Sequence, residues 1–259
     1  MPSNALIILT HGGAGSDNAH SDGTGRACQA GLEAMQSKTP ALDVACRAVE
    51  ILEDDPRFNA GTGSRKRSDG SIRLDASCMD SHHRFGAVTG LQNIKNPVQA
   101  ARGVADSQYR LLAGEDARQF ALELGLATAE FPNRESEAAG TDTVGAVVYD
   151  GEHFAAALST GGTGGSRPGR VGDVPLIGCG LYTGPRGAVA ATGHGESIAM
   201  NLTAYRTYEL IERGVAPPEA LDIVLGWFEE TQDIGLLIVS RQGYAGGSNR
   251  SMAWSALTG

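Results

Sequence analysis

The sequence contains no long hydrophobic run. Its first residues, MPSNALIILTHGG, hold one short apolar stretch at residues 5–9, and no later segment approaches the roughly 18 apolar residues of a membrane span. This stretch has no basic region before it and is too short for the core of a signal peptide. We therefore interpret residues 5–9 as a β-strand and expect a cytoplasmic protein that does not bind or cross a membrane.

Basic residues are also scarce. The chain has 21 Lys and Arg against 30 Asp and Glu, which gives a formal net charge of -9. Its one basic run is Arg65-Lys66-Arg67. Because nucleic-acid binding requires a basic patch, this charge balance argues against a nucleic-acid partner. We expect the triplet to form a solvated turn.

Cysteine and histidine are few and scattered. The four cysteines form no CxxC pair, which disfavours both a disulfide framework and a zinc site. Cys28 and Cys46 lie in helical patterns among alanines, where a small buried thiol fits well. The single adjacent histidine pair, His82-His83, lies in a polar loop without further ligands at metal-binding spacing.

Glycine, in contrast, is abundant. The 36 glycines cluster in loops at residues 11–15, 59–64, 159–165 and 192–196. Between these loops, periodicity and cap residues predict helices over residues 41–54, 96–114, 115–126, 196–213 and 217–230. Strand patterns flank Asp150-Gly151 and cover residues 187–192 and a closing hairpin at 235–247. Because strands and helices do not alternate regularly, we expect a single α+β domain over residues 1–259, with antiparallel sheet covered by helices.

One junction stands out between the polar stretch 128–140 and a strand pattern. In GTDTVGAVVYDG, residues 140–151, the strand pattern begins at Thr143, directly after Asp142. A threonine at a chain terminus carries a hydroxyl nucleophile and, in its α-amine with a pKa of about 7.7–8.0, a base. Cleavage after Asp142 would create such a terminus. The alternative is that Thr143 is an ordinary β-branched residue that opens a strand.

Two further patterns suit the same chemistry. Arg170 and Asp173 lie three residues apart on a loop rich in glycine and proline, where they could bind the α-carboxylate and α-amine of an amino acid. The alternative for this pair is an internal ion pair. The segments STGG (159–162) and ATGHGE (191–196) place threonine hydroxyls beside glycine N–H groups, which could form an oxyanion hole.

Eight motifs occur together in one order along the chain. They are HGGAG, LEDDPRFNAGTGS, DASCMD, NPVQAAR, DTVGAVVYD, LSTGG, GRVGD and TGHGE. In this order they resemble the plant-type L-asparaginases, also called isoaspartyl peptidases, which are threonine N-terminal-nucleophile hydrolases. The resemblance runs from Leu6 to about Trp254. It implies a four-layer αββα sandwich that cleaves itself into residues 1–142 and 143–259 and forms a homodimer of such αβ units.

The resemblance also implies roles for single residues. Thr143 matches the nucleophile released by cleavage after Asp142, and Thr160 matches the threonine that assists it. The other matches are the oxyanion hole at Thr192 and Gly193, the substrate ligands Arg170 and Asp173, the Gly195 carbonyl as a further amine contact, and Asn59 close to the nucleophile. His194 is expected at the pocket rim and not as a catalytic base.

Residues 52–62 resemble the family's sodium-binding loop, in which backbone carbonyls hold the ion. The matching residues are Leu52, Glu53, Asp55, Phe58, Ala60 and Thr62. Such an ion would be structural, and we expect no catalytic cofactor.

Three features depart from the family pattern. The segment between Leu126 and Thr143 spans only about 17 residues, where the family commonly has a longer one. Ser81 stands where glycine usually follows the MD of DASCMD. Asp142 stands where many asparaginases have glycine and the related glycosylasparaginases have aspartate.

The expected activity is therefore hydrolysis of β-aspartyl dipeptides and L-asparagine through a β-aspartyl ester on Thr143. The alternatives are cleavage of N-glycosylated asparagine and an unprocessed, non-catalytic relative that acts as a binding module.

Overall fold

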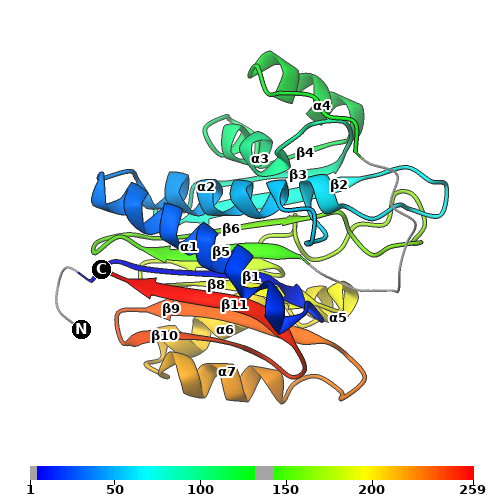
Figure 1. The fold of residues 1–259 in the computed structure, drawn as a ribbon. Helices are drawn as coiled ribbons and strands as arrows, with labels where there is room; N and C mark the ends of the chain where they lie inside the picture. The colour runs from blue at the N-terminus through cyan, green and yellow to red at the C-terminus, as the bar shows by residue number, and fades with distance from the viewer. Residues whose placement is uncertain (1–4, 132–142) are drawn as a thin grey trace.

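The computed structural model describes residues 5–131 and 143–259, so Asp142 and its proposed cleavage lie outside the described residues. Two β-sheets stack face to face, and helices cover the outer face of each (Figure 1). The larger sheet has the strand order β11-β1-β5-β6-β2-β3-β4, and the smaller has the order β10-β9-β8-β7. Every neighbouring pair is antiparallel except β3 and β4. This is the αββα sandwich predicted from the sequence.

The strands of the larger sheet are β1 (Ile7–Ala14), β2 (Leu74–Asp80), β3 (Phe85–Leu91), β4 (Leu111–Ala113), β5 (Val144–Tyr149), β6 (Phe154–Thr160) and β11 (Met252–Thr258). Those of the smaller sheet are β7 (Leu181–Gly184), β8 (Gly187–Gly193), β9 (Ile234–Ser240) and β10 (Gly243–Ser248). Helices α1 (Ser21–Gln36), α2 (Ala41–Asp54), α3 (Pro97–Ala105) and α4 (Gly114–Glu123) lie against the larger sheet. Helices α5 (Gly195–Met200), α6 (Thr203–Glu212) and α7 (Pro217–Leu225) lie against the smaller one.

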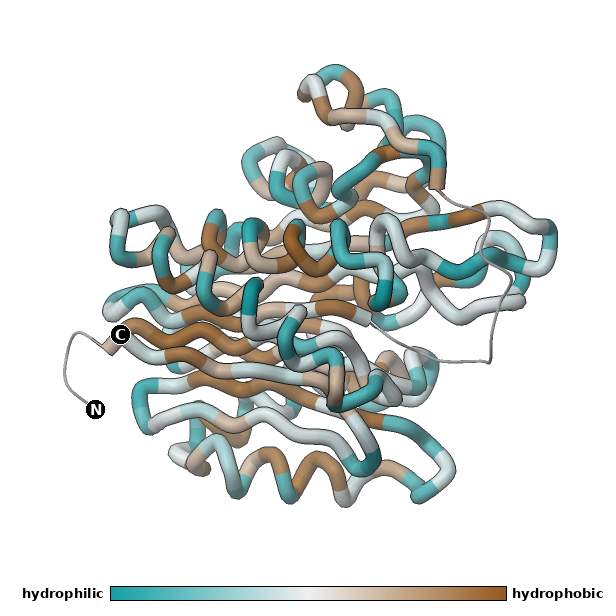
Figure 2. Tube along the Cα trace, in the orientation of Figure 1, coloured by the Kyte–Doolittle hydropathy of each residue, from teal (hydrophilic) through white to brown (hydrophobic). Residues whose placement is uncertain are grey.

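Alternating side chains along each strand divide the core into layers. On β5, Ala146 and Val148 pack toward the helices, whereas Val147 and Tyr149 pack between the two sheets. Figure 2 shows the resulting hydrophobic strands inside and hydrophilic turns outside. Because side chains alternate with a period of two, Thr143 has the same parity as Val147 and faces the layer between the sheets.

Several sequence predictions are confirmed. Helix α2 covers the predicted residues 41–54, and β5 and β6 form the predicted hairpin around Asp150. Strands β8, β9 and β10 also lie where the patterns placed them. In the described part of the chain, no helix is long and apolar enough to cross a membrane.

Other predictions were wrong in extent. The helix predicted over 96–114 ends at Ala105. The Ser107 hydroxyl donates a hydrogen bond to the Val104 carbonyl and accepts one from the Tyr109 N–H. These local hydrogen bonds favour a turn over a continued helix. Residues 111–113 then form β4.

The helix predicted over 196–213 is interrupted at Leu202, which has φ 49°. At this break the side chains of Asn201 and Thr203 donate hydrogen bonds to backbone carbonyls of α5. The loop predicted at residues 11–15 is largely strand, since β1 continues to Ala14.

Candidate active site

Thr143 and Thr160 meet at one end of the layer between the sheets, and Thr192 directly precedes Gly193, which lines the same cavity. Thr143 directly precedes β5, and Thr160 ends β6; Val144 pairs with Ser159, so these two strand ends share one edge of the larger sheet. Thr192 lies near the end of β8 in the opposing sheet. A small cavity at this edge is lined by Thr143, Thr160, Gly162, Thr163, Arg170, Gly172, Asp173 and Gly193. Residues far apart in sequence are thereby brought together.

The proposed nucleophile is nearly inaccessible. Thr143 is 5% exposed, and the strand begins one residue after it, at Val144, rather than at Thr143 itself. Thr143 therefore lies directly before a buried strand and lines the cavity. Its place next to β5 favours a defined position, which nucleophilic attack requires because small displacements of a reacting atom reduce rates strongly.

The hydroxyl of Thr160 has a defined orientation. Its oxygen accepts a hydrogen bond from the Gly162 N–H (2.9 Å), which leaves its own proton available for donation into the cavity. Asn59 fixes the same turn, since its amide nitrogen donates to the Gly162 carbonyl (2.8 Å) and its amide oxygen accepts from the Arg65 N–H (3.0 Å). Asn59 thus acts on the site through Gly162.

The segment expected to form the oxyanion hole lies on the other sheet. Thr192 accepts a hydrogen bond from the Ala14 N–H (3.2 Å), so its hydroxyl proton remains free to donate. Gly193 has φ 138°, and a β-carbon there would lie 2.0 Å from the Asp233 carbonyl oxygen. Only glycine fits this position, which keeps the main chain close against the cavity.

Arg170, Asp173 and Gly195 also converge. A β-carbon on Gly195 would lie 2.8 Å from Nη2 of Arg170 and 2.9 Å from Oδ1 of Asp173, so both side chains face the Gly195 main chain. Asp173 is buried, and its Oδ2 has no hydrogen-bond partner within residues 5–131 and 143–259. Burial raises the pKa of the Asp173 carboxyl to about 7. An ammonium group placed here would supply the missing partner.

The internal partner of Arg170 is Glu196, which the sequence reasoning missed. Nε and Nη2 of Arg170 donate to the two carboxylate oxygens at 2.9 and 2.7 Å. This pairing holds the pKa of Glu196 down at about 2. Since a guanidinium has five N–H donors, Nη1 and the other Nη2 proton remain to bind a carboxylate. The motif TGHGE contains this glutamate but does not indicate its partner.

Two histidines border the site. His11 is buried on β1 opposite Gly145, where a β-carbon would lie 2.4 Å from its Nε2. Burial lowers the pKa of His11 to about 3, so its ring is neutral. His194 instead accepts a hydrogen bond from the Ser197 N–H and caps α5. That position agrees with a residue at the rim rather than a base.

The loop at residues 52–62 folds back on the end of α2. Gly61 has φ 48°, and a β-carbon there would lie 2.6 Å from the Glu53 carbonyl oxygen. The carbonyls of Leu52, Asp55, Phe58 and Ala60 each accept one backbone hydrogen bond. Each keeps a second lone pair with which a carbonyl oxygen can bind a cation. The sodium ion itself stays a prediction.

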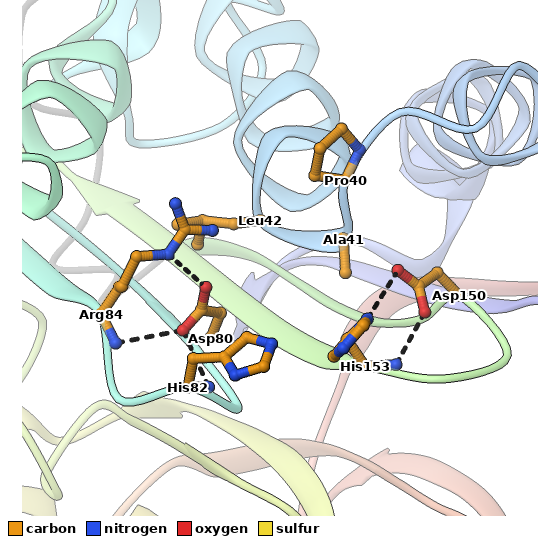
Figure 3. A pocket seen from close by; sticks show the side chains of 8 residues that line it. All are labelled: Pro40, Ala41, Leu42, Asp80, His82, Arg84, Asp150 and His153. Atoms are coloured by element: carbon orange, nitrogen blue, oxygen red, sulfur yellow. Dashed lines mark hydrogen bonds and ion pairs between the residues drawn. The ribbon is translucent and has the colours of Figure 1, made fainter.

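A larger cavity of about 290 Å³ lies at the opposite end of the sheet, where the β2–β3 and β5–β6 turns meet the start of α2 (Figure 3). Its polar groups bond within their own turns: Asp80 accepts from Arg84 Nε, and Asp150 accepts from the His153 N–H. The His82 and His153 rings lie 4.7 Å apart. No group of three or more metal-binding side chains occurs here or elsewhere in the described residues.

Comparison with known proteins places the sequence in a family. A sequence model of the asparaginase family matches residues 4–135 and 127–258. The isoaspartyl peptidase/L-asparaginase of Homo sapiens is 36% identical over 287 residues, 98% of this chain and 93% of that protein. The protein of the same name from Danio rerio is 35% identical over 286 residues, 96% of this chain and 91% of that protein.

A bacterial relative extends the comparison. The isoaspartyl peptidase of Salmonella typhimurium is 36% identical over 251 residues, 82% of this chain and 80% of that protein. Matches of this identity and coverage, together with the αββα sandwich, establish that the chain belongs to the asparaginase family of N-terminal-nucleophile hydrolases.

Proposed function

We propose that this protein hydrolyses β-aspartyl dipeptides and L-asparagine, after cleaving itself between Asp142 and Thr143. The observation that carries the proposal is the convergence of Thr143, Thr160, Arg170 and Asp173 on one cavity. The cavity combines a nucleophile with a cation and an anion for the two charged groups of an aspartyl headgroup. The names of the relatives support this choice of substrate.

In the first half of the reaction, the Thr143 hydroxyl attacks the side-chain carbonyl of the substrate. The α-amine of Thr143, with a pKa near 7.7–8.0 as a free terminus, takes the hydroxyl proton. The oxyanion that forms is held by the Thr192 hydroxyl and the main chain at Gly193. The same amine then donates the proton to the departing nitrogen, which leaves as ammonia or as an amino acid.

In the second half, water attacks the β-aspartyl ester on Thr143. The α-amine takes a proton from this water and returns it to the threonine oxygen as aspartate leaves. Arg170 holds the α-carboxylate throughout, and Asp173 with the Gly195 carbonyl holds the α-ammonium. The reaction thus needs no catalytic cofactor.

The test compares three substrates: the dipeptide β-Asp-Leu, L-asparagine and a glycosylated asparagine. Wild type is expected to release aspartate from the first two, and Thr143→Ala from none. Thr39→Ala, a half-buried threonine outside the site, serves as the matched control. Full activity in Thr143→Ala would overturn the mechanism. Activity restricted to the glycosylated substrate would instead favour the glycosylasparaginase alternative, to which Asp142 points.

The expected homodimer has one supporting feature. Met200, Leu202 and Ile177 are 86%, 48% and 48% exposed, which is unusual for apolar side chains gathered around the start of α6. We propose that this surface contributes to the contact between two αβ units. Sedimentation of wild type and Met200→Glu tests this, with a shift toward the monomer expected in the variant.

The cytoplasmic location also remains a proposal.

A further inference from the structure

Arg67 does not lie in a solvated turn. The basic triplet was expected to be exposed, but the Arg67 side chain is 1% exposed, whereas Lys66 beside it is half-buried. The sequence prediction was wrong for Arg67, because a charge run by itself does not show that one of its members has buried partners. A buried guanidinium is costly unless it is paired and hydrogen-bonded.

The partners of Arg67 lie on the loop that follows Thr160 and around the start of β2. Nη1 donates to the Ser166 hydroxyl (2.6 Å), and Nη2 lies 3.9 Å from the carboxylate of Asp75. The two segments are also joined through their backbones. The Gly165 N–H donates to the Lys66 carbonyl (2.8 Å), and the Ser68 N–H donates to the Ser166 carbonyl (2.9 Å).

The guanidinium of Arg67 fills the space that a side chain at position 162 would need. A β-carbon on Gly162 would lie 2.3 Å from Nη2 and 2.5 Å from Nη1 of Arg67. Gly162 has φ 71°, a conformation that glycine adopts without strain. The flat cation therefore packs directly against the Gly162 main chain, and Arg67 itself does not line the cavity.

Gly162 is also the residue that orients Thr160. Its N–H donates to the Thr160 hydroxyl oxygen, and its carbonyl accepts from Asn59. Arg67 and Asn59 therefore hold the same turn by different means, one by contact and one by a hydrogen bond. Asp75 joins this support, because it pairs with Thr160 across β2 and β6 and receives hydrogen bonds from Thr89 and Gly90.

We propose that Arg67 is a positioning residue that fixes the Gly162 turn and, through it, the hydroxyl of Thr160 beside Thr143. The inference rests on the proposed function, in which Thr160 assists the nucleophile. Arg67 does not line the cavity, whereas Arg170 and Asp173 do, so we infer that it makes no direct contact with the substrate. Its removal should therefore disturb the chemical step and leave the binding of the aspartyl headgroup intact.

The experiment measures kcat and KM for β-Asp-Leu in Arg67→Met, normalised to the fraction of chains with a free Thr143 terminus. We expect kcat to fall by about tenfold to 100-fold and KM to stay within about threefold of wild type, because a displacement of about 1 Å at the reacting groups costs about 100-fold and a smaller one costs less. Lys66→Met removes the neighbouring charge without touching Gly162 and is expected to keep wild-type kcat. Arg67→Lys retains the charge but not the planar fork, so it should recover only part of the activity.

Arg67→Met leaves Asp75 without its cation, so a folding defect is a risk. Arg67→Met/Asp75→Asn removes both charges, and Gly162→Ala displaces the guanidinium with Arg67 intact; both are expected to lower kcat with little change in KM. Wild-type kcat in any folded variant that lacks the Arg67–Gly162 contact would overturn the inference, as would a loss confined to KM. Inactivity of wild type itself would instead refute the proposed function.

Discussion

Asp173→Asn is expected to weaken substrate binding and to stabilise the fold at the same time. Asp173 is 4% exposed, and burial raises the pKa of its carboxyl from 3.8 to about 7. The folded protein therefore ionises this group at a cost in free energy. A difference of about three pKa units corresponds to about 4 kcal/mol, which is the upper limit of what the substitution can restore.

The sign of the pH dependence follows from proton binding. An unfolded chain releases the Asp173 proton near pH 3.8, whereas the folded protein keeps it until about pH 7. Between these values the folded state binds more protons at Asp173, so the contribution of Asp173 to wild-type stability falls as the pH rises and is constant above about pH 7. Asparagine has no proton to release. The gain in Asp173→Asn should be small near pH 4 and largest above pH 7, with a Tm increase of up to about 10 °C.

The same substitution should weaken substrate binding, although it stabilises the fold. Binding of the substrate ammonium requires the Asp173 carboxylate, so KM for L-asparagine in wild type is expected to fall as the pH rises from about 5.5 to 7 and then level off. Asp173→Asn should lack this change and show a KM raised by at least about tenfold, as expected on loss of a charged hydrogen bond.

The assay combines calorimetry at two pH values with KM measurements across the pH range. Succinamic acid, which lacks the α-amine, is the matched substrate, and its KM should respond little to the substitution. A gain in stability over wild type that is no larger at pH 8 than at pH 4, together with an unchanged KM for L-asparagine, would refute the assignment of Asp173.

Three further substitutions test the remaining parts of the site. Arg170→Met should raise KM at least about 100-fold for substrates with a free α-carboxylate, through loss of a bidentate charged pair; unchanged KM would remove Arg170 from this role. Glu196→Gln should raise KM several-fold, because Arg170 loses the carboxylate that orients it; a lower KM would show that Glu196 competes with substrate. Thr192→Val should lower kcat by about 10²–10³, as loss of one oxyanion donor does, whereas Thr192→Ser should retain most activity; equal kcat values in the two variants would contradict the role of this hydroxyl.

Much of the fold could be predicted because the relevant signals are local. Apolar spacing over residues 41–54 defines α2, and Asp150-Gly151 marks the hairpin between β5 and β6. The ordered motifs predicted that Thr143, Thr160 and Arg170 lie close together. This prediction came from the resemblance to a known family, because hydrophobic periodicity indicates local structure and not contacts between distant residues.

The parts that could not be predicted depend on distant partners. Strand β11 gave no clear pattern, and its place in the sheet comes from pairing with β1. Glu196 could not be assigned from the sequence, because its partner Arg170 lies on the loop after β6. Arg67 belongs to a basic triplet, and only the packing of the Gly162 turn shows why it is buried.

The central claim is that Thr143 becomes a chain terminus, and the mass of the purified protein under denaturing conditions tests it most directly. Wild type is expected to give two fragments, with masses for residues 1–142 and 143–259. Thr143→Ala is expected to give one full-length chain, because it lacks the hydroxyl that attacks the preceding peptide bond. A single full-length chain from active wild type would contradict the account, since Thr143 would then have no free amine to act as its base.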